Sequence, residues 1–120
     1  STPKAPAAIG PYSQAIIHNG MIYCSGQIPL NPETMKIVGD DASSQTQQVM
    51  ENLSEVLKEA GSDFTKVIKC SIFLDDMGDF GKVNEVYGSF FAADPPARET
   101  VAVQTLPKEV LVEISCIAYI

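Results

Sequence analysis

The chain contains a single arginine, Arg98, and its position makes it the first candidate for binding a ligand. It follows Pro95-Pro96-Ala97 and opens a predicted strand, so the backbone around it should be rigid. A guanidinium group is planar and can donate two parallel hydrogen bonds to a carboxylate, which a lysine cannot do. Arg98 is therefore predicted to hold the carboxylate of a small metabolite. The alternatives are a surface arginine or an ion pair within the chain.

Glu113 is the second candidate, because it interrupts an apolar run between Val112 and Ile114. A carboxylate that points inward from a strand is partly desolvated, which raises its pKa and makes it a usable proton carrier near neutral pH. Carboxylates inside strands are rare unless they are paired or functional. Glu113 therefore carries a proton, pairs with Arg98, or lies at an exposed edge.

Three further positions have groups that could line the same site. Ser25-Gly26 offers a hydroxyl and a glycine that a ligand can approach closely, or it is only a turn at the end of a strand. Tyr12 is a pocket wall or a residue of the N-terminal segment packed on the core. Asn84, in a predicted helix, reaches a ligand or caps a loop by hydrogen bonding. The residues alone leave each pair of interpretations open.

Composition and missing motifs argue against several classes of function. Acidic residues outnumber basic residues by 15 to 8, and the lysines are scattered, so the net charge of −7 disfavours nucleic-acid binding. The sequence has no G-x-G-x-x-G, P-loop or G-x-S-x-G motif and no Cys–His pairing, which disfavours hydride transfer, phosphoryl transfer and triad hydrolysis. The single histidine, His18, has no carboxylate cluster at metal-ligand spacing, so we expect no metal site.

The length of 120 residues, 45% of them hydrophobic, fits one domain over residues 1–120 with its own core. No apolar run is long enough to span a membrane, and the N-terminus lacks the apolar core of a signal peptide. Cys24, Cys70 and Cys116 are far apart and are expected to be inert thiols in a reducing compartment. We therefore expect a cytoplasmic protein, or an organellar one if a presequence has been removed.

A hairpin is the clearest local signal among the elements that must position these residues. Asn19-Gly20 supplies the positive φ angles of a two-residue type I′ turn and lies between two β-rich segments, 16–18 and 21–24. Residues 1–11, rich in proline and alanine, are predicted to be an extended arm. Residues 27–39 are predicted to be a long connection after the hairpin.

Apolar residues three and four positions apart predict two amphipathic helices. The first has its apolar stripe from Val49 to Ala60 and Gly61 as its C-cap. The second is predicted to be capped by Asp79 and to carry an apolar stripe from Phe80 to Phe91. The Pro95-Pro96 pair prevents the second helix from continuing.

Three further strands are predicted, over about 67–74, 99–104 and 110–119. In the first of them, one face is predicted to carry Ile68, Cys70, Ile72 and Leu74. The resulting order favours an α+β fold, in which two helices cover one face of a mixed sheet. Both faces of the last strand are too apolar for open water, so we expect a homo-oligomer that buries the second face.

Taken together, these segments resemble the reactive intermediate deaminase family, and specifically its RidA branch. The resemblance runs nearly end to end, through Ala7–Gln14, Ser25–Pro29, Asp79-Phe80, Val83-Asn84, Tyr87, Pro96–Arg98, Leu106-Pro107 and Val112–Ile114. It implies a chorismate-mutase-like α+β subunit in a homotrimer, whose sheets meet in a central barrel. It also implies active sites in the clefts between neighbouring subunits.

The resemblance implies an activity as well. RidA proteins hydrolyse 2-imino acids such as 2-iminobutanoate and 2-iminopropanoate, or their enamine tautomers, to 2-oxo acids and ammonia without metal or cofactor. By position, Arg98 would anchor the substrate carboxylate and Glu113 would position and activate the attacking water. Five further residues are implied to contact the substrate or shape its pocket, namely Tyr12, Ser25, Gly26, Asn84 and Thr100.

One departure and two alternatives accompany this interpretation. Many relatives have cysteine two residues after the arginine, where this chain has Thr100, but the implied contact is through the backbone, so activity should survive. A ribonuclease or translation inhibitor is the first alternative, and the acidic charge argues against it. A non-enzymatic binding or chaperone-like module is the second. The presence of Glu113 together with Arg98 argues against it, because carboxylate binding alone does not need Glu113.

Overall fold

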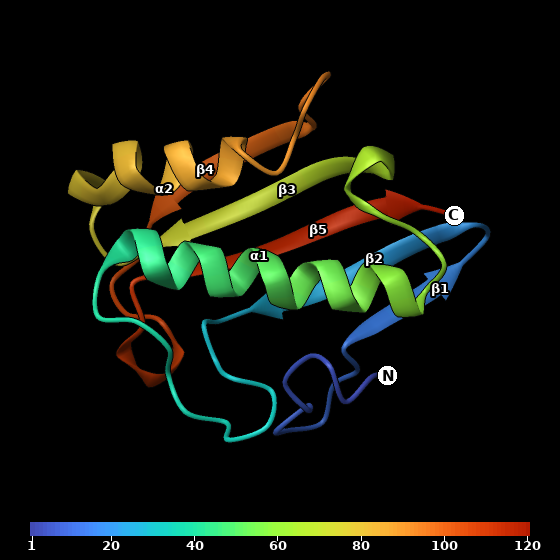
Figure 1. The fold of residues 1–120 in the computed structure, drawn as a ribbon, viewed down its shortest axis with the longest axis horizontal. Coiled ribbons are helices and arrows are strands. Elements are labelled where there is room, and N and C mark those ends of the chain that lie inside the picture. Colours follow the sequence, from blue (N-terminus) through green and yellow to red (C-terminus); the bar gives the residue numbers. More distant parts are fainter.

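The computed structural model describes residues 1–120 as one mixed sheet with two helices packed on one of its faces (Figure 1). The strands are β1 (Ala15–His18), β2 (Met21–Gln27), β3 (Val67–Leu74), β4 (Ala97–Ala102) and β5 (Val112–Tyr119). The helices are α1 (Ala42–Glu59) and α2 (Phe80–Gly88). The sheet order is β1-β2-β5-β3-β4, with β3 and β4 parallel and all other neighbours antiparallel. The predicted α+β architecture is confirmed.

The predicted hairpin is confirmed in register as well as in position. Asn19 and Gly20 have φ angles of 51° and 75°, and Ile17 pairs with Ile22 across the turn. Two consecutive residues with positive φ make the type I′ turn, whose twist matches that of the two strands.

Helix α1 begins where a side chain satisfies its first free backbone donors. The carboxylate of Asp41 accepts a 2.7 Å hydrogen bond from the backbone N–H of Ser44. Gly61, with a φ of 86°, follows the last turn as predicted. The buried face of α1 carries the predicted apolar stripe, which includes Val49, Met50, Leu53, Val56 and Leu57.

Helix α2 is shorter than predicted, and Asp79 occupies its N-cap position as predicted but makes no capping hydrogen bond with its side chain. The carboxylate of Asp76 accepts the backbone N–H of Gly78 in a short 3-10 turn, whereas Asp79 makes no capping hydrogen bond. The helix ends at Gly88, before the Pro95-Pro96 pair can act on it. Phe90 and Phe91 lie beyond its end, where both rings pack edge-on against another aromatic ring, Phe64, at 5.5 Å between centroids. Aromatic packing therefore replaces the last predicted turn.

Strand β3 also differs from its predicted face. Cys70, Ile72 and Leu74 are buried under the helices, but Ile68 is 45% exposed. The pairing of β3 with β5 shifts register between Val67 and Lys69, which places Val67 in the core instead. An irregularity of this kind breaks the simple alternation on which the prediction depended.

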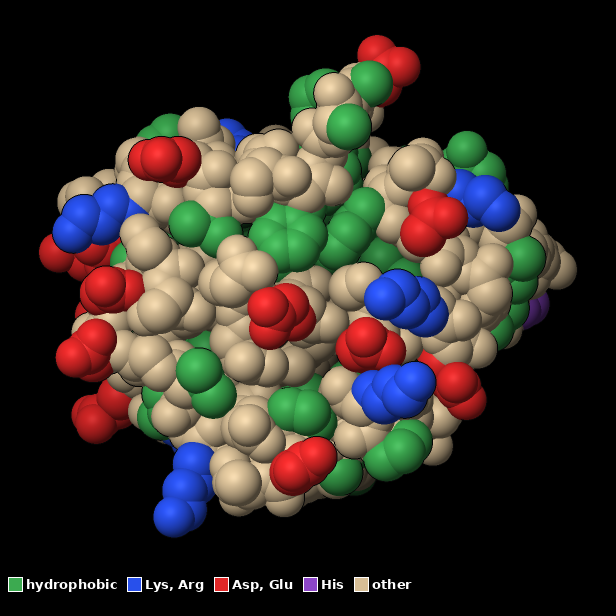
Figure 2. All heavy atoms as spheres, in the orientation of Figure 1, with side chains coloured by type: hydrophobic (Ala, Val, Ile, Leu, Met, Phe, Trp, Pro, Cys, Tyr) green, Lys and Arg blue, Asp and Glu red, His purple; other side chains and the backbone are tan.

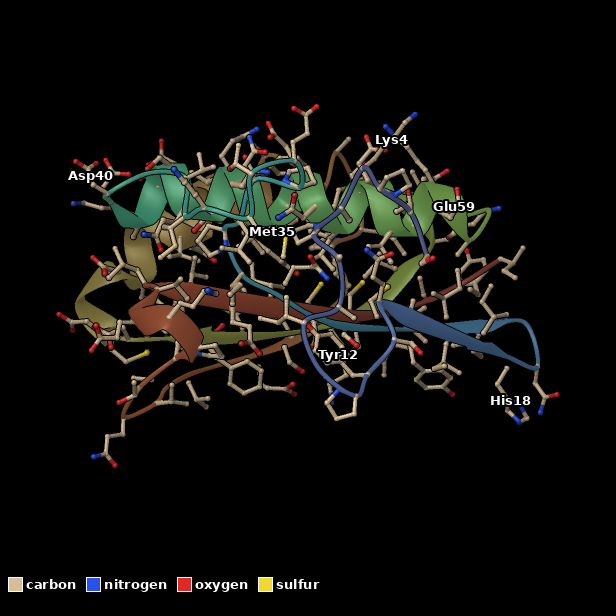
Figure 3. The ribbon with its side chains drawn as sticks, turned by 90° about the horizontal axis from the view of Figure 1, so that it is seen from below. Lys4, Tyr12, His18, Met35, Asp40 and Glu59 are labelled. Carbon is tan, nitrogen blue, oxygen red and sulfur yellow. The ribbon has the colours of Figure 1, made fainter.

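The N-terminal segment is not the extended arm that was predicted. It folds back on the body of the molecule, so that Thr2 and Ala5 are buried. Tyr12 is half exposed and does not pack on the core, and it lies on the side of the sheet away from α1 (Figure 3).

The two faces of the sheet have different environments. Alternate residues of β5 from Val112 to Ala118 are buried under the helices, and the intervening ones lie on the opposite face, which no element of the chain covers. That open face carries exposed apolar side chains, among them Ile16, Tyr23, Val101 and Tyr119. Acidic side chains are distributed over the helix face (Figure 2). No helix combines the length and apolar character that crossing a membrane requires.

The three cysteines form a row across the middle of the sheet. Cys116 is the register partner of Cys24 on one side and of Cys70 on the other. All three thiols are buried and free. Burial raises the pKa of the Cys70 thiol, which agrees with the prediction that these cysteines pack as small apolar side chains.

Candidate active site

Arg98 lies on the edge strand β4, with its side chain on the helix side of the sheet. Its guanidinium carbon is 5.2 Å from the ring centroid of Tyr87 and 5.6 Å from that of Phe80. Its Nη1 donates a 2.5 Å hydrogen bond to Oδ1 of Asn84, also on α2. Two aromatic rings and one amide therefore hold the guanidinium in a defined orientation.

No carboxylate neutralises this guanidinium. The ion pairs in the structure are Lys58 with Glu55 and Lys69 with Glu99. Glu99 is adjacent to Arg98 in sequence, but strand alternation places it on the other face of the sheet, where its carboxylate is 3.1 Å from the Lys69 ammonium. The alternative that Arg98 forms an ion pair within the chain is therefore wrong.

A hollow of about 440 Å³ opens beside Arg98. It is lined by residues of α2, of the loop after it and of β4: Asn84, Tyr87, Gly88, Pro95, Pro96 and Arg98. The loop of residues 89–96 rises above the edge of the sheet between α2 and β4 (Figure 1). An unneutralised guanidinium in a partly apolar hollow can bind a small carboxylate.

Two buried hydroxyl groups lie on the same side of the sheet as Arg98. Neither Oγ1 of Thr100 nor the hydroxyl of Tyr87 has a hydrogen-bond partner. Burial raises the pKa of the Tyr87 hydroxyl, and the neighbouring Cys70 thiol raises this pKa further. The hydroxyl therefore stays protonated. The family resemblance implies a role for Thr100 only through its backbone, so a buried hydroxyl without a partner is an additional feature of this position.

Glu113 lies on β5, on the open face of the sheet. Its side chain is partly buried, and burial raises the pKa of its carboxyl group, as predicted. It has no ion-pair partner, so the alternative that it pairs with Arg98 is wrong. A carboxylate with a raised pKa and no cationic partner can accept and return a proton near neutral pH.

Gly26 and Ser25 lie beside Glu113 in a bulge of β2. Cys24 and Gln27 pair with Cys116 and Ile114, so Ser25 and Gly26 together oppose one residue of β5. A Cβ placed on Gly26 would be 2.9 Å from the Cδ of Glu113, and closer still to its carboxylate oxygen. Only glycine therefore allows the Glu113 carboxylate to lie over this backbone.

The sequence-predicted site residues thus fall into two groups in one chain. The Arg98 group consists of Arg98, Asn84 and Thr100, on the helix side at the β4 edge. The Glu113 group consists of Glu113, Gly26, Ser25 and Tyr12, on the opposite side. Strand β3 lies between β4 and β5, so the two groups are separated both across the sheet and by its thickness. One chain does not bring Arg98 and Glu113 to a common ligand.

Sequence reasoning missed the aromatic surroundings of Arg98. The apolar spacing predicts that Phe80 and Tyr87 belong to a core-facing stripe, yet both rings contact the guanidinium. Their spacing around Asn84, at four and three residues, places all three on one helix face. That spacing next to a lone arginine was the available signal. No group of three or more His, Cys, Asp or Glu residues in the structure could hold a metal ion.

Comparisons with known proteins agree with this fold over nearly the whole chain. Residues 2–120 match the family model described as Endoribonuclease L-PSP. Among curated relatives, the chloroplastic Reactive Intermediate Deaminase A of Arabidopsis thaliana is 49% identical over 98% of this chain and 63% of its own length. The 2-iminobutanoate/2-iminopropanoate deaminase of Rattus norvegicus is 47% identical over 98% of this chain and 86% of its own length.

A solved structure resembles the whole subunit. The crystal structure of E. coli TdcF with bound serine superposes with a TM-score of 0.95 at 40% sequence identity. The match covers 100% of this chain and 96% of that one. The ligand of that relative is an amino acid, which carries a carboxylate.

Proposed function

Because the chain belongs to the Endoribonuclease L-PSP family, which includes proteins named reactive intermediate deaminase A, we propose that it hydrolyses reactive 2-imino acids to 2-oxo acids and ammonia. The observation that carries this proposal is the unpaired Arg98 guanidinium, held by Asn84 beside a hollow of small-metabolite size. The substrates are 2-iminobutanoate, 2-iminopropanoate and their enamine tautomers, and the reaction needs neither metal nor cofactor.

In the proposed reaction, Arg98 binds the substrate carboxylate and fixes the orientation of the C=N bond. A protonated imine carbon is already electrophilic, so orientation and one proton carrier are sufficient for hydrolysis. Glu113 takes a proton from the attacking water as the C–O bond forms, and it returns the proton to the nitrogen. The Glu113 carboxylate then takes the proton of the new hydroxyl group as the C=O bond forms and the C–N bond breaks, which releases ammonia and leaves the 2-oxo acid. Loss of this proton to solvent or to the ammonia restores the carboxylate. Backbone groups of Gly26 and Thr100 contact the substrate, and Tyr12, Ser25 and Asn84 line the pocket.

The two separated groups support a site shared between subunits. The Arg98 group and the Glu113 group lie on opposite faces of one sheet, so a ligand that touches both must lie between two chains. The proposed assembly is a homotrimer in which the open faces meet in a central barrel. The exposed apolar side chains of that face support such burial. Three buried free thiols agree with a reducing compartment, either the cytoplasm or an organelle.

An endoribonuclease activity is the second candidate, because the matching family model carries that description. The net charge of −7 and the acidic helix face argue against an RNA-binding surface (Figure 2). A non-enzymatic module that binds small carboxylates is the third candidate. It would use Arg98 and leave Glu113 without a role.

Trapping the imine in vitro separates these candidates. An amino-acid oxidase generates the 2-imino acid, and semicarbazide captures whatever the protein has not hydrolysed. The unmodified chain should deplete the trapped imine, and Arg98→Lys should lose about 100-fold in kcat/KM, because lysine keeps the charge but loses the two-pronged hydrogen bond. Lys82→Ala, which removes an exposed cation from α2, is the control and should behave as the unmodified protein.

Each outcome decides between candidates. Bound 2-oxo acid without accelerated imine loss would favour the binding module. RNA cleavage that persists in Arg98→Lys, with no imine hydrolysis by any variant, would favour the endoribonuclease.

A further inference from the structure

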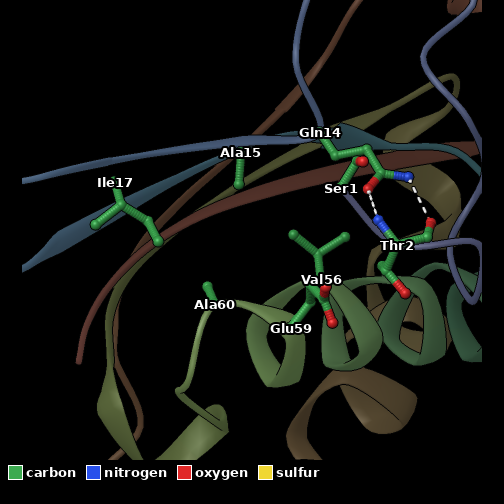
Figure 4. Close-up of a pocket in the computed structure, with 8 residues that line it drawn as sticks. All are labelled: Ser1, Thr2, Gln14, Ala15, Ile17, Val56, Glu59 and Ala60. Carbon is green, nitrogen blue, oxygen red and sulfur yellow. Dashed lines mark hydrogen bonds between the residues drawn. The ribbon is translucent and has the colours of Figure 1, made fainter.

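The side chain of Gln14 ties the N-terminal segment into a closed loop. Its Oε1 accepts a 2.7 Å hydrogen bond from the backbone N–H of Thr2, and its Nε2 donates to three carbonyl oxygens, at 3.1 Å to Thr2, 3.3 Å to Ala5 and 2.8 Å to Pro6. Figure 4 shows the amide between the first residues of the chain and β1. Gln14 is 5% exposed, so these bonds form away from water, where each contributes most.

Inside this loop, a tight turn presents Tyr12 to solvent. The backbone N–H of Tyr12 donates to the carbonyl of Gly10 at 2.8 Å, and the Tyr12 ring lies against Gly10. The ring is half exposed, and its hydroxyl accepts a 3.5 Å hydrogen bond from the backbone N–H of Ile9, which belongs to the same loop. The position of Tyr12 therefore depends on the two ends of the loop, and Gln14 holds them together.

Ser13 and Gln14 attach the loop to β2, beside Glu113. The backbone N–H of Ser25 donates to the carbonyl of Gln14 at 2.9 Å, and the Ser25 hydroxyl donates to the carbonyl of Ser13 at 2.5 Å. Ser25 precedes Gly26, over which the Glu113 carboxylate lies. Gln14 therefore binds residues 2, 5 and 6 through its side chain and β2 through its backbone carbonyl, one residue before Gly26.

We propose that Gln14 is a positioning residue of the imine-hydrolysing site: its buried amide closes the loop of residues 2–14 and so fixes Tyr12 and Ser25 relative to Glu113. This role rests on the proposed function. Gln14 contacts no substrate in it. The residue acts through the loop, so its loss should change how the substrate is held rather than the chemistry of Glu113.

Gln14→Glu is the sharpest test, because it keeps the size of the side chain and the acceptor for the Thr2 N–H. It replaces the donating Nε2 with an oxygen that faces carbonyl oxygens, so the loop should open. We expect KM for the imine to rise about 10-fold, the loss of one substrate contact, with kcat nearly unchanged. The matched control is Gln47→Glu, the same substitution on the exposed face of α1.

Two further measurements keep the test independent of misfolding. Trypsin should cut after Lys4 faster in Gln14→Glu than in the control, because Lys4 lies within the loop that Gln14 closes. Removal of residues 1–6 takes away every backbone group that bonds to the Gln14 side chain and leaves Gln14 itself. This truncation should raise KM in the same way. Partial unfolding alone would lower kcat in proportion to the folded fraction and leave KM unchanged.

The outcomes separate this role from the proposed function. If the unmodified protein hydrolyses the imine, and Gln14→Glu and the truncated chain both keep its KM although Gln14→Glu is cut faster after Lys4, the positioning role is wrong and the function stands. If the unmodified protein hydrolyses no imine, the proposed function fails and the role of Gln14 fails with it.

Discussion

The side-chain oxygen Oδ1 of Asn84 accepts a 2.5 Å hydrogen bond from Nη1 of Arg98, and no carboxylate competes for that guanidinium. Asn84 is neutral, so it orients the arginine without cancelling its charge. In a chain with a net charge of −7, this is the arrangement that leaves a positive group available to an anionic ligand.

Replacing Asn84 with aspartate should therefore harm the site more than removing its side chain. Asn84→Asp has the same shape but supplies a carboxylate that neutralises Arg98, so KM for a 2-imino acid should rise about 10-fold above that of Asn84→Ala. Steady-state kinetics with both variants measure this difference. Equal KM values for the two variants would mean that Asn84 only fills space.

Changing Glu113 to glutamine should remove the acidic limb of the pH profile. Burial raises the pKa of Glu113, so kcat/KM of the unmodified protein should fall as the pH drops through a value above that of an ordinary carboxyl group. Glu113→Gln should lower kcat about 100-fold and flatten that limb. A variant that keeps the same limb at full activity would exclude Glu113 as the proton carrier.

The same substitution should also stabilise the subunit. Because the folded-state pKa of Glu113 lies above the unfolded one, ionising this carboxylate destabilises the folded state at neutral pH. Glu113→Gln should then raise the free energy of unfolding at pH 7. The gain should fade as the pH drops through the folded-state pKa and vanish below the unfolded-state value of about 4.3. Urea unfolding of both proteins at pH 7 and at a pH below the unfolded-state pKa tests the sign of this stability difference.

A methyl group at Gly26 should clash with Glu113. Gly26→Ala is expected to displace the carboxylate and to cost about 1 kcal/mol of stability, at the low end of overpacking costs because the clash is with the far end of a flexible side chain. In the Glu113→Ala background the clash is gone, so the added cost of Gly26→Ala should fall close to zero. Gly81→Ala, where nothing lies within 4 Å of the new Cβ, is the matched control. An equal cost of Gly26→Ala in both backgrounds would contradict the contact.

Glycine at position 108 should stabilise the fold. Lys108 has a φ of 56° in the short turn before β5, a conformation that costs a side chain roughly 1–2 kcal/mol. We expect Lys108→Gly to raise the free energy of unfolding by about 1 kcal/mol. Lys66→Gly, at a position without positive φ, should lower it. The midpoints of urea unfolding compare the two.

Local signals in the sequence predicted the parts of the fold that depend on local physics. Asn19-Gly20 determines the hairpin because a two-residue turn needs positive φ at both positions. The end of α2 could not be predicted in the same way, because Phe90 and Phe91 leave the helix to pack on Phe64, which is distant in sequence. Ile68 was placed on the wrong face because an irregularity in the pairing of β3 leaves no mark on apolar spacing.

The candidate site shows the same limit. Arg98 and Glu113 could each be identified from the sequence, by residue type and by the residues on either side. Their placement on opposite faces of the sheet required the register of three strands, β4, β3 and β5. The role of Gln14 was not predictable either, since its partners are visible only once the N-terminal segment folds back.

The separation of the Arg98 group from the Glu113 group has a genetic consequence. If each site takes its arginine from one chain and its glutamate from a neighbour, two inactive alleles can rescue each other. In mixed assemblies of Arg98→Lys and Glu113→Gln chains, about one site in four would inherit both intact groups. A cell carrying both defective copies would then clear imines that neither copy clears alone. A site built within one chain would show no such complementation.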